Sequence, residues 1–434
     1  MQQARAIWKG AAAFAVVGLV ATGCGSSSKS ASTTAPSSSS GSTATTAGGS
    51  SAGGGSVPGI TASTITVDEM ADVSGPVPGL FAGAVDGMDA WAAQVNASGG
   101  IDGRKVVVVH KDTALSCSAA TTAYKDALTS SFAAVGSYTL VDVCGEPTLK
   151  ANPTFPDLEA SVLTPALGAL PNVYGEVPAV NGYATTGYAW VEQKYGLSAV
   201  QHTADLYAAT AAADYAAQRP AANQVGYKYI YTRAFGNTET NFTADILRMK
   251  SDNVQVVDAI DMSAPDLAGF LEQAAQQDFK PDAVINTSGY DPTLFKLTGT
   301  VADDNPLMFP LPYAMYLGED AAAVPEITTM TTWLHKTHPS DQVNLYVMES
   351  FAAGLLFQQA MSTLGANPTR AGLLSALSGI TNFTADGLVA PSNVGQKKGT
   401  YCDVIVRPEN GKFVRVDPAS GFECNGTFVN VPSS

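Results

Sequence analysis

The sequence contains few charged residues, and most of them carry the same sign. Charged residues make up 14 % of the 434 positions, and 38 acidic against 23 basic side chains give a formal net charge of −15. No cluster of basic residues offers a surface that could neutralise phosphates, so we expect no nucleic-acid partner. Of only four histidines, His335 and His338 could share a helical face. Without a third clear ligand they favour a solvated surface, and we predict no metal and no cofactor.

Catalytic sequence patterns are also missing. From Val57 onwards the chain contains neither a Gly-x-Ser-x-Gly elbow nor a phosphate-binding P-loop. Carboxylates are numerous in any acidic chain, so unplaced pairs do not indicate acid–base chemistry. We therefore predict that the protein is not an enzyme. A hydrolase, which would need a nucleophile–base pair in a cleft, is an alternative.

The apolar run near the N-terminus is too short for a membrane span, which needs about 20 residues. It extends over 11–20, after Arg5 and Lys9, and small residues follow it up to Cys24. This order is typical of an export signal, and the small residues before the cysteine resemble a bacterial lipobox. We predict a lipoprotein signal peptide over 1–23 and lipidation of Cys24, which places the protein outside the cytoplasm on the outer face of the bacterial cell membrane. An ordinary secretory signal with an incidental cysteine is the alternative.

The segment after Cys24 has the composition of a linker. Residues 25–56 are almost entirely Ser, Thr, Gly and Ala, and such a stretch cannot bury a core. We predict a flexible tether over 24–57. As a Gly/Ser-type coil it would hold the following domain on the order of 30 Å from its anchor.

The cysteine count agrees with export. Without Cys24, four cysteines remain, in two pairs that are close in sequence. Even cysteines in an exported chain favour Cys117–Cys144 and Cys402–Cys424 disulfides. Buried free thiols are the alternative, and a zinc site is disfavoured because no pair has the short ligand spacing.

The remaining residues alternate between strand and helix patterns. The chain is long enough for two domains, and 45 % hydrophobic residues can build their cores. Strands alternating with helices predict parallel sheets with right-handed crossovers, in which ligands lie at the carboxyl ends of the strands. Ser263 and Pro265 indicate a helix start. We expect strands over 65–70, 106–109 (covered on both faces), 132–135, 162–164, 254–259 and 283–286, and helices over 81–95, 118–128, 183–195, 242–250 and 266–277.

Several of these segments resemble the branched-chain amino-acid (Leu/Ile/Val-type) substrate-binding proteins of ABC transporters. They are the strand 65–70, the turn Ser74-Gly75-Pro76, the segment VNASGGIDGR at 95–104, and two helical patterns at 241–245 and 270–274. The resemblance implies a type I periplasmic-binding fold, an α/β architecture with two Rossmann-like lobes of parallel sheet joined by a three-segment hinge. The first lobe would contain 58–182 with about 314–397, and the second 183–313 with about 398–434. The Cys117–Cys144 pair also resembles a disulfide near the first-lobe site of this family.

The resemblance further implies where a ligand would bind. First-lobe backbone N–H groups and hydroxyls would hold a ligand carboxylate, and a polar or acidic group, mostly from the second lobe, would meet an ammonium. Each candidate has a structural alternative, such as shaping a turn, capping a helix (Asp291) or filling the core. The first-lobe candidates are Ser74, Ser137, Tyr138, Thr139, Ala166 and Gly168; the others are Tyr207 (expected at a loop-to-helix position), Asp261, Tyr290, Asp291 and Tyr346.

Together these features predict a lipid-anchored solute-binding protein. Its ligand would be an amino acid or a related small polar molecule, and its partner an ABC permease in the membrane. We expect a monomer. A receptor domain that senses a ligand and signals to a membrane partner is a second alternative.

Overall fold

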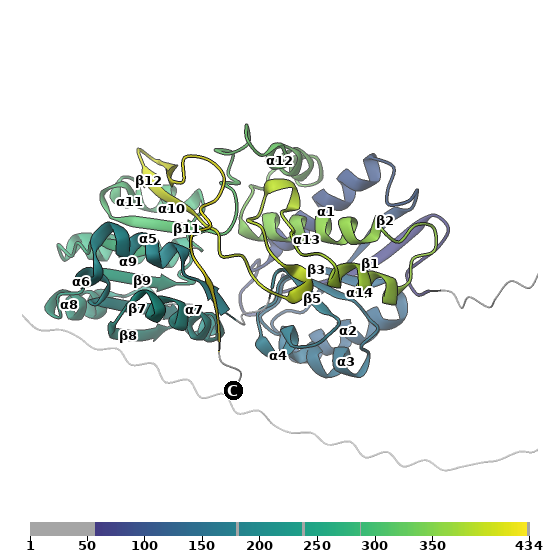
Figure 1. Cartoon of the computed structure of the whole chain (residues 1–434), viewed down its shortest axis with the longest axis horizontal. Helices are drawn as coiled ribbons and strands as arrows, with labels where there is room; N and C mark the ends of the chain where they lie inside the picture. Colours follow the sequence, from purple (N-terminus) through teal and green to yellow (C-terminus); the bar gives the residue numbers. More distant parts are fainter. Residues whose placement is uncertain (1–56, 179–181, 237–238, 287, 432–434) are drawn as a thin grey trace, which may run out of the picture. The chain divides into compact units, whose positions relative to one another are not determined.

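A computed structural model describes residues 57–178, 182–236, 239–286 and 288–431 of the chain. The predicted signal peptide, Cys24 and the tether up to Ser56 lie outside these residues. Within the described part, two large sheets and the helices around them form two lobes (Figure 1). No helix in this part is both long and apolar enough to cross a membrane. The predicted α/β class with two lobes of mainly parallel sheet is confirmed.

The first lobe begins with five strands and four α-helices: β1 (Thr64–Ala71), α1 (Ala82–Ala97), β2 (Lys105–Asp112), α2 (Cys117–Ser130), β3 (Ala133–Ser137), α3 (Glu146–Ala151), β4 (Asp157–Ser161), α4 (Pro165–Gly168) and β5 (Val173–Val177). Their strands form a sheet in the order β2-β1-β3-β4-β5, in which every pair is parallel. Parallel neighbours need crossover connections, and the helices between the strands supply them.

The second lobe contains a seven-stranded sheet. Its helices are α5 (Thr186–Tyr195), α6 (Leu197–Val200), α7 (Ala212–Val225), α8 (Thr243–Ser251), α9 (Ala264–Gln276), α10 (Thr293–Thr298) and α11 (Val301–Asp304). Its strands are β7 (Thr203–Ala208), β8 (Tyr229–Phe235), β9 (Val256–Ile260), β10 (Ala283–Ile285), β11 (Leu307–Leu311), β12 (Val404–Glu409) and β13 (Lys412–Asp417). The sheet order is β13-β12-β11-β10-β9-β7-β8. Strands β7 to β11 pair in parallel, whereas β12 and β13 extend the sheet antiparallel.

The chain passes between the lobes three times. It leaves the first lobe after β5, returns after β11, and enters the second lobe again before β12. The returning segment forms α12 (Pro325–Thr337), α13 (Leu345–Met361) and α14 (Arg370–Ser378). Helix α13 packs against α1 and against β3, β4 and β5, so this late segment belongs to the first lobe (Figure 1). A small antiparallel pair joins β6 (Gly182–Ala184) to β14 (Phe428–Asn430).

Most expected elements are present, and the exceptions have physical reasons. The strand expected at 106–109 is not covered on both faces, because β2 is an edge strand and Val107 is 42 % exposed. The strand expected at 162–164 is wrong: β4 precedes it, and two buried carboxyls in that strand, Asp157 and Glu159, hide it from an apolar pattern. The helix expected from 183 begins at Thr186, after β6. The predicted cap of α9 is confirmed, since the Ser263 hydroxyl accepts the Asp266 N–H.

Candidate functional site

Residues of both lobes enclose a cavity of about 480 Å³, a size typical of small-molecule sites. The carboxyl ends of the strands supply part of its lining, including Ser161 of β4, Val177 of β5 and Ala208 of β7. The segments that connect the lobes supply another part, including Pro312 and Thr400. The cavity therefore lies where open parallel sheets place their ligands and where a hinge movement would change its shape.

Three aromatic rings pack together on the first-lobe side of the cavity. Phe81 precedes α1, Tyr138 follows β3, and Tyr346 lies in the first turn of α13. The ring centroids of Phe81 and Tyr138 are 4.4 Å apart, and Tyr346 lies 5.0 Å from Phe81 and 5.1 Å from Tyr138. All three line the cavity. They give it a rigid, largely apolar wall with aromatic faces and edges.

Acidic side chains distinguish the rest of the lining. No Lys, Arg or His belongs to the lining among the described residues. Asp261 adopts a φ of 50°, a left-handed conformation that is uncommon for residues other than glycine and that is found more often at functional sites. Six carboxylic acids line the cavity: Glu176, Asp214, Asp261, Asp266, Glu349 and Asp403.

Burial raises the pKa values of Glu176, Asp214 and Glu349. The pKa of Glu349 is raised to about 8 by burial and by the charge of Asp261, although a hydrogen bond with Tyr138 opposes the shift. The pKa of Glu176 lies well above its usual value because of burial and the charge of Glu349. Burial and the neighbouring Asp261 raise the pKa of Asp214 in the same direction. Burial therefore disfavours the charged form of each of these three groups, and a cation close to them would favour it.

Three of the predicted ligand contacts line this cavity: Tyr138, Asp261 and Tyr346. Ser137 and Thr139 flank Tyr138 but are fully buried outside the lining. The Ser137 hydroxyl accepts the Met70 N–H at 3.2 Å, and the Thr139 hydroxyl donates to Asp72 at 3.0 Å. Both hydroxyls are thus already engaged within the protein.

The other predicted contacts lie elsewhere. Ser74 donates its N–H to Asp112 at 3.2 Å, and Ala166 and Gly168 belong to α4. Tyr207 is a residue of β7, and not of a loop-to-helix position, and its ring stacks on Tyr215 at 4.1 Å. None of these residues lines the cavity. Their contact with a ligand stays a prediction.

Two second-lobe candidates also lie outside the lining. Tyr290 is buried and donates its hydroxyl to Glu319 at 3.0 Å. Asp291 accepts the Thr293 N–H at 2.7 Å, where α10 begins. This bond is the kind expected if Asp291 caps the helix, which was the alternative to ligand binding. Contact of Tyr290 or Asp291 with a ligand remains a prediction.

Sequence reasoning did not identify Glu176 or Glu349. Each is a single charge inside an apolar segment, Val173–Val177 and the wholly buried 347–357 of α13. Carboxylates are rarely buried without a partner. An isolated acid in an apolar run is therefore the signal that could have found them.

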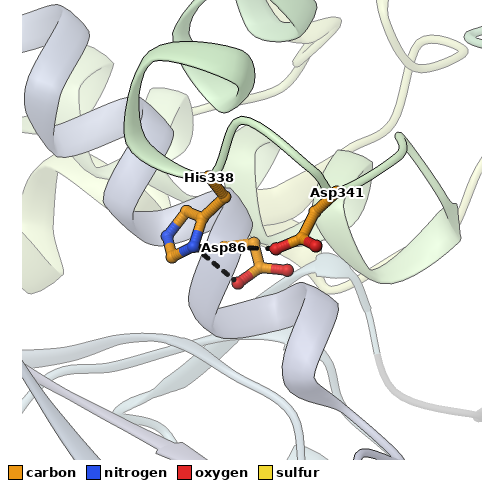
Figure 2. A group of neighbouring side chains, drawn as sticks. All are labelled: Asp86, His338 and Asp341. Atoms are coloured by element: carbon orange, nitrogen blue, oxygen red, sulfur yellow. Dashed lines mark ion pairs between the residues drawn. The ribbon is translucent and has the colours of Figure 1, made fainter.

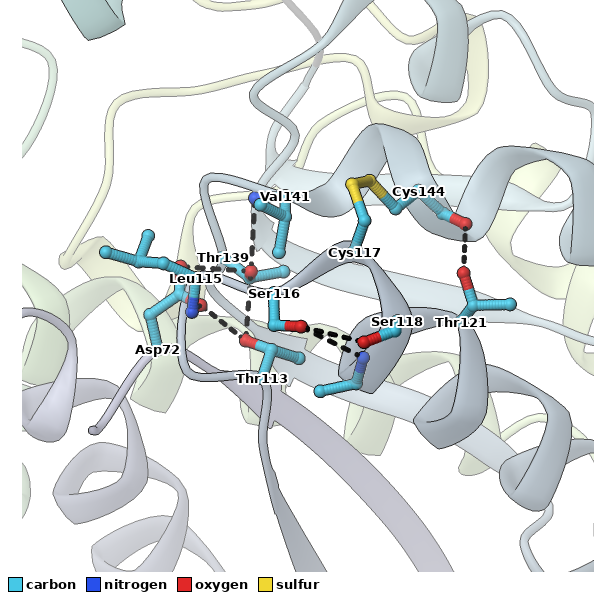
Figure 3. The surroundings of a disulfide bond; sticks show 11 residues. Asp72, Thr113, Leu115, Ser116, Cys117, Ser118, Thr121, Thr139, Val141 and Cys144 are labelled. Carbon is cyan, nitrogen blue, oxygen red and sulfur yellow. Dashed lines mark hydrogen bonds between the residues drawn. A yellow bond between two sulfur atoms is a disulfide. The ribbon is translucent and has the colours of Figure 1, made fainter. Parts of the chain in front are cut away.

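Both predicted disulfides are formed, Cys117–Cys144 and Cys402–Cys424. Figure 3 shows the first of them at the start of α2, close to a buried hydrogen-bond network. The centre of that network is Asp72, whose carboxylate accepts from Thr113, Thr139 and the Leu115 N–H at 2.5, 3.0 and 2.7 Å. Asp72 thus fixes the loops that follow three strands of the first-lobe sheet.

His338, expected on a solvated surface, is partly buried and contacts acidic side chains. It follows α12, and its ring lies 3.4 Å from Asp86 of α1 (Figure 2). The ring also lies 3.0 Å from Asp89 of the same helix. Asp341 lies 3.8 Å from Nδ1, the same ring nitrogen that faces Asp86, whereas Asp89 lies at Nε2. Asp86, His338 and Asp341 each have one oxygen or nitrogen atom of a kind that can bind a metal ion, and these three atoms lie within 4.8 Å of one another. Carboxylates on both sides of a histidine form ion pairs whenever the ring is protonated, and here they join α12 to α1.

Comparison with known proteins places the chain in context. A family model described as periplasmic binding protein matches residues 64–403. No curated protein matches the chain by sequence. A fatty acid ABC transporter substrate-binding protein from Thermomonospora curvata is similar in structure, with a TM-score of 0.70, 18 % identity, and coverage of 86 % of this chain and 96 % of that one.

Two further solved structures share the fold. A branched chain amino acid ABC transporter protein from Thermus thermophilus with bound valine has a TM-score of 0.68 and 13 % identity, covering 83 % of this chain and 97 % of its own. An ABC transporter substrate-binding protein from Sphaerobacter thermophilus has a TM-score of 0.68 and 18 % identity. The match covers 83 % of this chain and 99 % of that one. At these identities the likeness concerns the fold alone.

Proposed function

Because this chain belongs to the periplasmic binding protein family, we propose that it is a solute-binding protein that delivers a small molecule to an ABC importer outside the cytoplasm. The observation that carries the proposal is the cavity of about 480 Å³ lined by both lobes and by the segments between them. A ligand that touches both walls stabilises the closed arrangement of a hinged protein, and a permease can distinguish that arrangement from the open one. The ligand class is an amino acid or a related small polar molecule.

The test is a binding screen on the purified full-length protein after removal of any co-purified ligand. Thermal unfolding would be followed with amino acids, amides, amines and small aromatic acids. A ligand at a hundred times its dissociation constant stabilises the folded state by about 2.7 kcal/mol, which corresponds to a shift of a few degrees. A selective, saturable shift without chemical change of the ligand supports the proposal. Conversion of the ligand would instead indicate the hydrolase alternative.

Two substitutions test whether the cavity is the binding site. Tyr346→Ala removes a ring from the aromatic wall and should weaken binding, because the ligand loses a packed surface. Trp333→Ala removes an aromatic ring of α12 outside the lining and should leave affinity unchanged. Equal affinities for both variants would contradict the assignment of the cavity.

We also propose that Cys24 carries a lipid anchor and that the protein acts as a monomer. In cells, the wild-type protein should then fractionate with membranes, whereas Cys24→Ala should be found in the soluble fraction. Recovery of the wild-type protein in the soluble fraction would contradict the proposed lipid anchor. A receptor role would be favoured if ligand addition changed a signalling response while uptake of the ligand stayed normal.

A further inference from the structure

Two buried carboxyl groups of the cavity lining each have one oxygen without a hydrogen-bond partner among the described residues. Glu176 of β5 is 4 % exposed and Glu349 of α13 is 5 % exposed, and both line the cavity. One oxygen of each, Oε2, has no hydrogen-bond partner among the described residues. A buried polar atom without a partner destabilises the fold. Because both residues line the cavity, a small rotation of either carboxyl group would bring such an oxygen to a ligand.

Acidic side chains of the second lobe line the same cavity. Asp261 follows β9 and accepts from Ser288 at 2.8 Å. Asp214 lies on α7 and lines the same cavity. The charge of Asp261 raises the pKa of Glu349, and the charge of Glu349 raises that of Asp214, so the acids of the two lobes interact electrostatically. A positive charge among them would be attracted by every one of these groups.

The neighbouring aromatic wall suits the same kind of group. The Tyr138 ring packs with Phe81 and Tyr346, and all three line the cavity together with Glu349. Aromatic faces attract ammonium and guanidinium groups as well as apolar carbons. The wall can therefore accommodate both the charged group and the body of an organic amine.

The lining offers a ligand carboxylate hydroxyl groups, such as those of Ser161 and Ser392, but no cation to pair with it among the described residues. No basic side chain belongs to it among the described residues, and six acids surround the space. The hydroxyls of Ser137 and Thr139, which the family resemblance would use for a carboxylate, are engaged with Met70 and Asp72. A carboxylate would thus add negative charge to an acidic cavity.

We propose that the ligand is an organic cation without a carboxylate, an amine or guanidine on an apolar body, whose charged group lies between Glu176, Glu349 and Asp261. This inference rests on the proposed function and narrows its ligand class. A bare metal ion does not fill a cavity of about 480 Å³, whereas an alkyl or arylalkyl amine has the size for it.

Calorimetric titration of the full-length protein with matched pairs of compounds tests the inference. Each pair differs by one carboxylate: 3-methylbutylamine and L-leucine, 2-phenylethylamine and L-phenylalanine, 1,4-diaminobutane and L-ornithine. The amine of at least one pair should bind at least about tenfold more tightly than its amino acid, because it avoids placing a carboxylate among acids. 3-Phenylpropionamide and calcium ions complete the panel as a neutral compound and a metal ion.

Isosteric substitutions locate the charge. Glu176→Gln and Glu349→Gln should each weaken amine binding by about tenfold or more, because an amide lacks the charge that pairs with the ammonium. Glu272→Gln changes an exposed acid of α9 outside the lining and should have no effect. The melting temperature of each ligand-free variant shows whether it folds. If a variant does not fold, the titrations of the wild-type protein with the matched amine and amino-acid pairs decide whether the ligand is a cation.

The outcomes separate this inference from the proposed function. Tight binding of amino acids or the amide with weak binding of every amine would overturn the cationic ligand but leave a solute-binding protein. Calcium binding that displaces the amines would overturn it as well. If amines bind but both glutamate variants bind them normally, the assigned position is wrong. If no compound in the panel binds, the cationic assignment fails together with its premise.

Discussion

Replacing Gly354 of α13 by alanine should destabilise the protein. A Cβ atom at this position would lie 2.3 Å from Cδ2 and 2.4 Å from Cγ of Trp91, the fully buried tryptophan of α1. The indole cannot move aside easily, because it packs edge-on against Phe357 and its Nε1 donates to Gln358 at 3.4 Å. The two helices would have to separate by roughly 1 Å to restore van der Waals contact.

The size of the effect follows from two opposing contributions. An alanine stabilises a helix by about 0.5–1 kcal/mol relative to glycine. Overpacking of a close-packed core typically costs about 1–3 kcal/mol. Because the overlap involves a rigid ring, we expect Gly354→Ala to lower the free energy of unfolding by about 1–2 kcal/mol.

Gly269 of α9 provides a matched control. A Cβ there would meet only Gln273 Nε2, at 3.9 Å. The same substitution should therefore raise the free energy of unfolding by about 0.5–1 kcal/mol. Urea unfolding followed by circular dichroism measures both. If Gly354→Ala is as stable as the wild type, α1 and α13 do not pack as described. Since α13 also carries Tyr346 and Glu349, we expect weaker ligand binding as well.

Three further predictions concern buried polar groups and the disulfide. The pKa of Glu349 is raised to about 8 from 4.5, so its contribution to stability is lost as the pH rises between these values. Glu349→Gln should consequently raise the free energy of unfolding more at about pH 8.5 than at about pH 5, and an equal gain would refute the shift. Replacing Cys117 and Cys144 by serine opens a loop with a sequence separation of 27, and calorimetry should find a loss of about 3–4 kcal/mol; no loss would show that the bond is not formed. Asp72→Asn puts an amide among N–H and O–H donors and should cost about 2–3 kcal/mol in urea unfolding, whereas the exposed Asp126→Asn should change stability by less than about 0.5 kcal/mol.

The local elements of this fold could be predicted because their patterns are local. The stripe of apolar residues from Phe81 to Val95 predicts α1, and Ser263 predicts the start of α9. Strand β4 could not be predicted in this way, since Asp157 and Glu159 are both buried in it. Their burial depends on neighbours from other segments, such as the Tyr124 hydroxyl that donates to Glu159 at 2.8 Å.

The cavity is harder to predict because no single segment forms it. Tyr138, Asp261 and Tyr346 could be nominated because the family resemblance indicates which segments face a ligand. Glu176 and Glu349 come from segments that are far apart in sequence and meet only when α13 packs on β5. The acidic character of the site is therefore a property of the tertiary structure and could not be obtained from composition, which is acidic throughout.

A crystal structure of the protein with its tightest-binding amine would test the central claim most directly. The ligand should occupy the cavity between the lobes, with its nitrogen within hydrogen-bond distance, about 2.7–3.2 Å, of Glu176 or Glu349. A ligand bound outside this cavity, or bound inside it with its charged group directed away from both glutamates, would contradict the account.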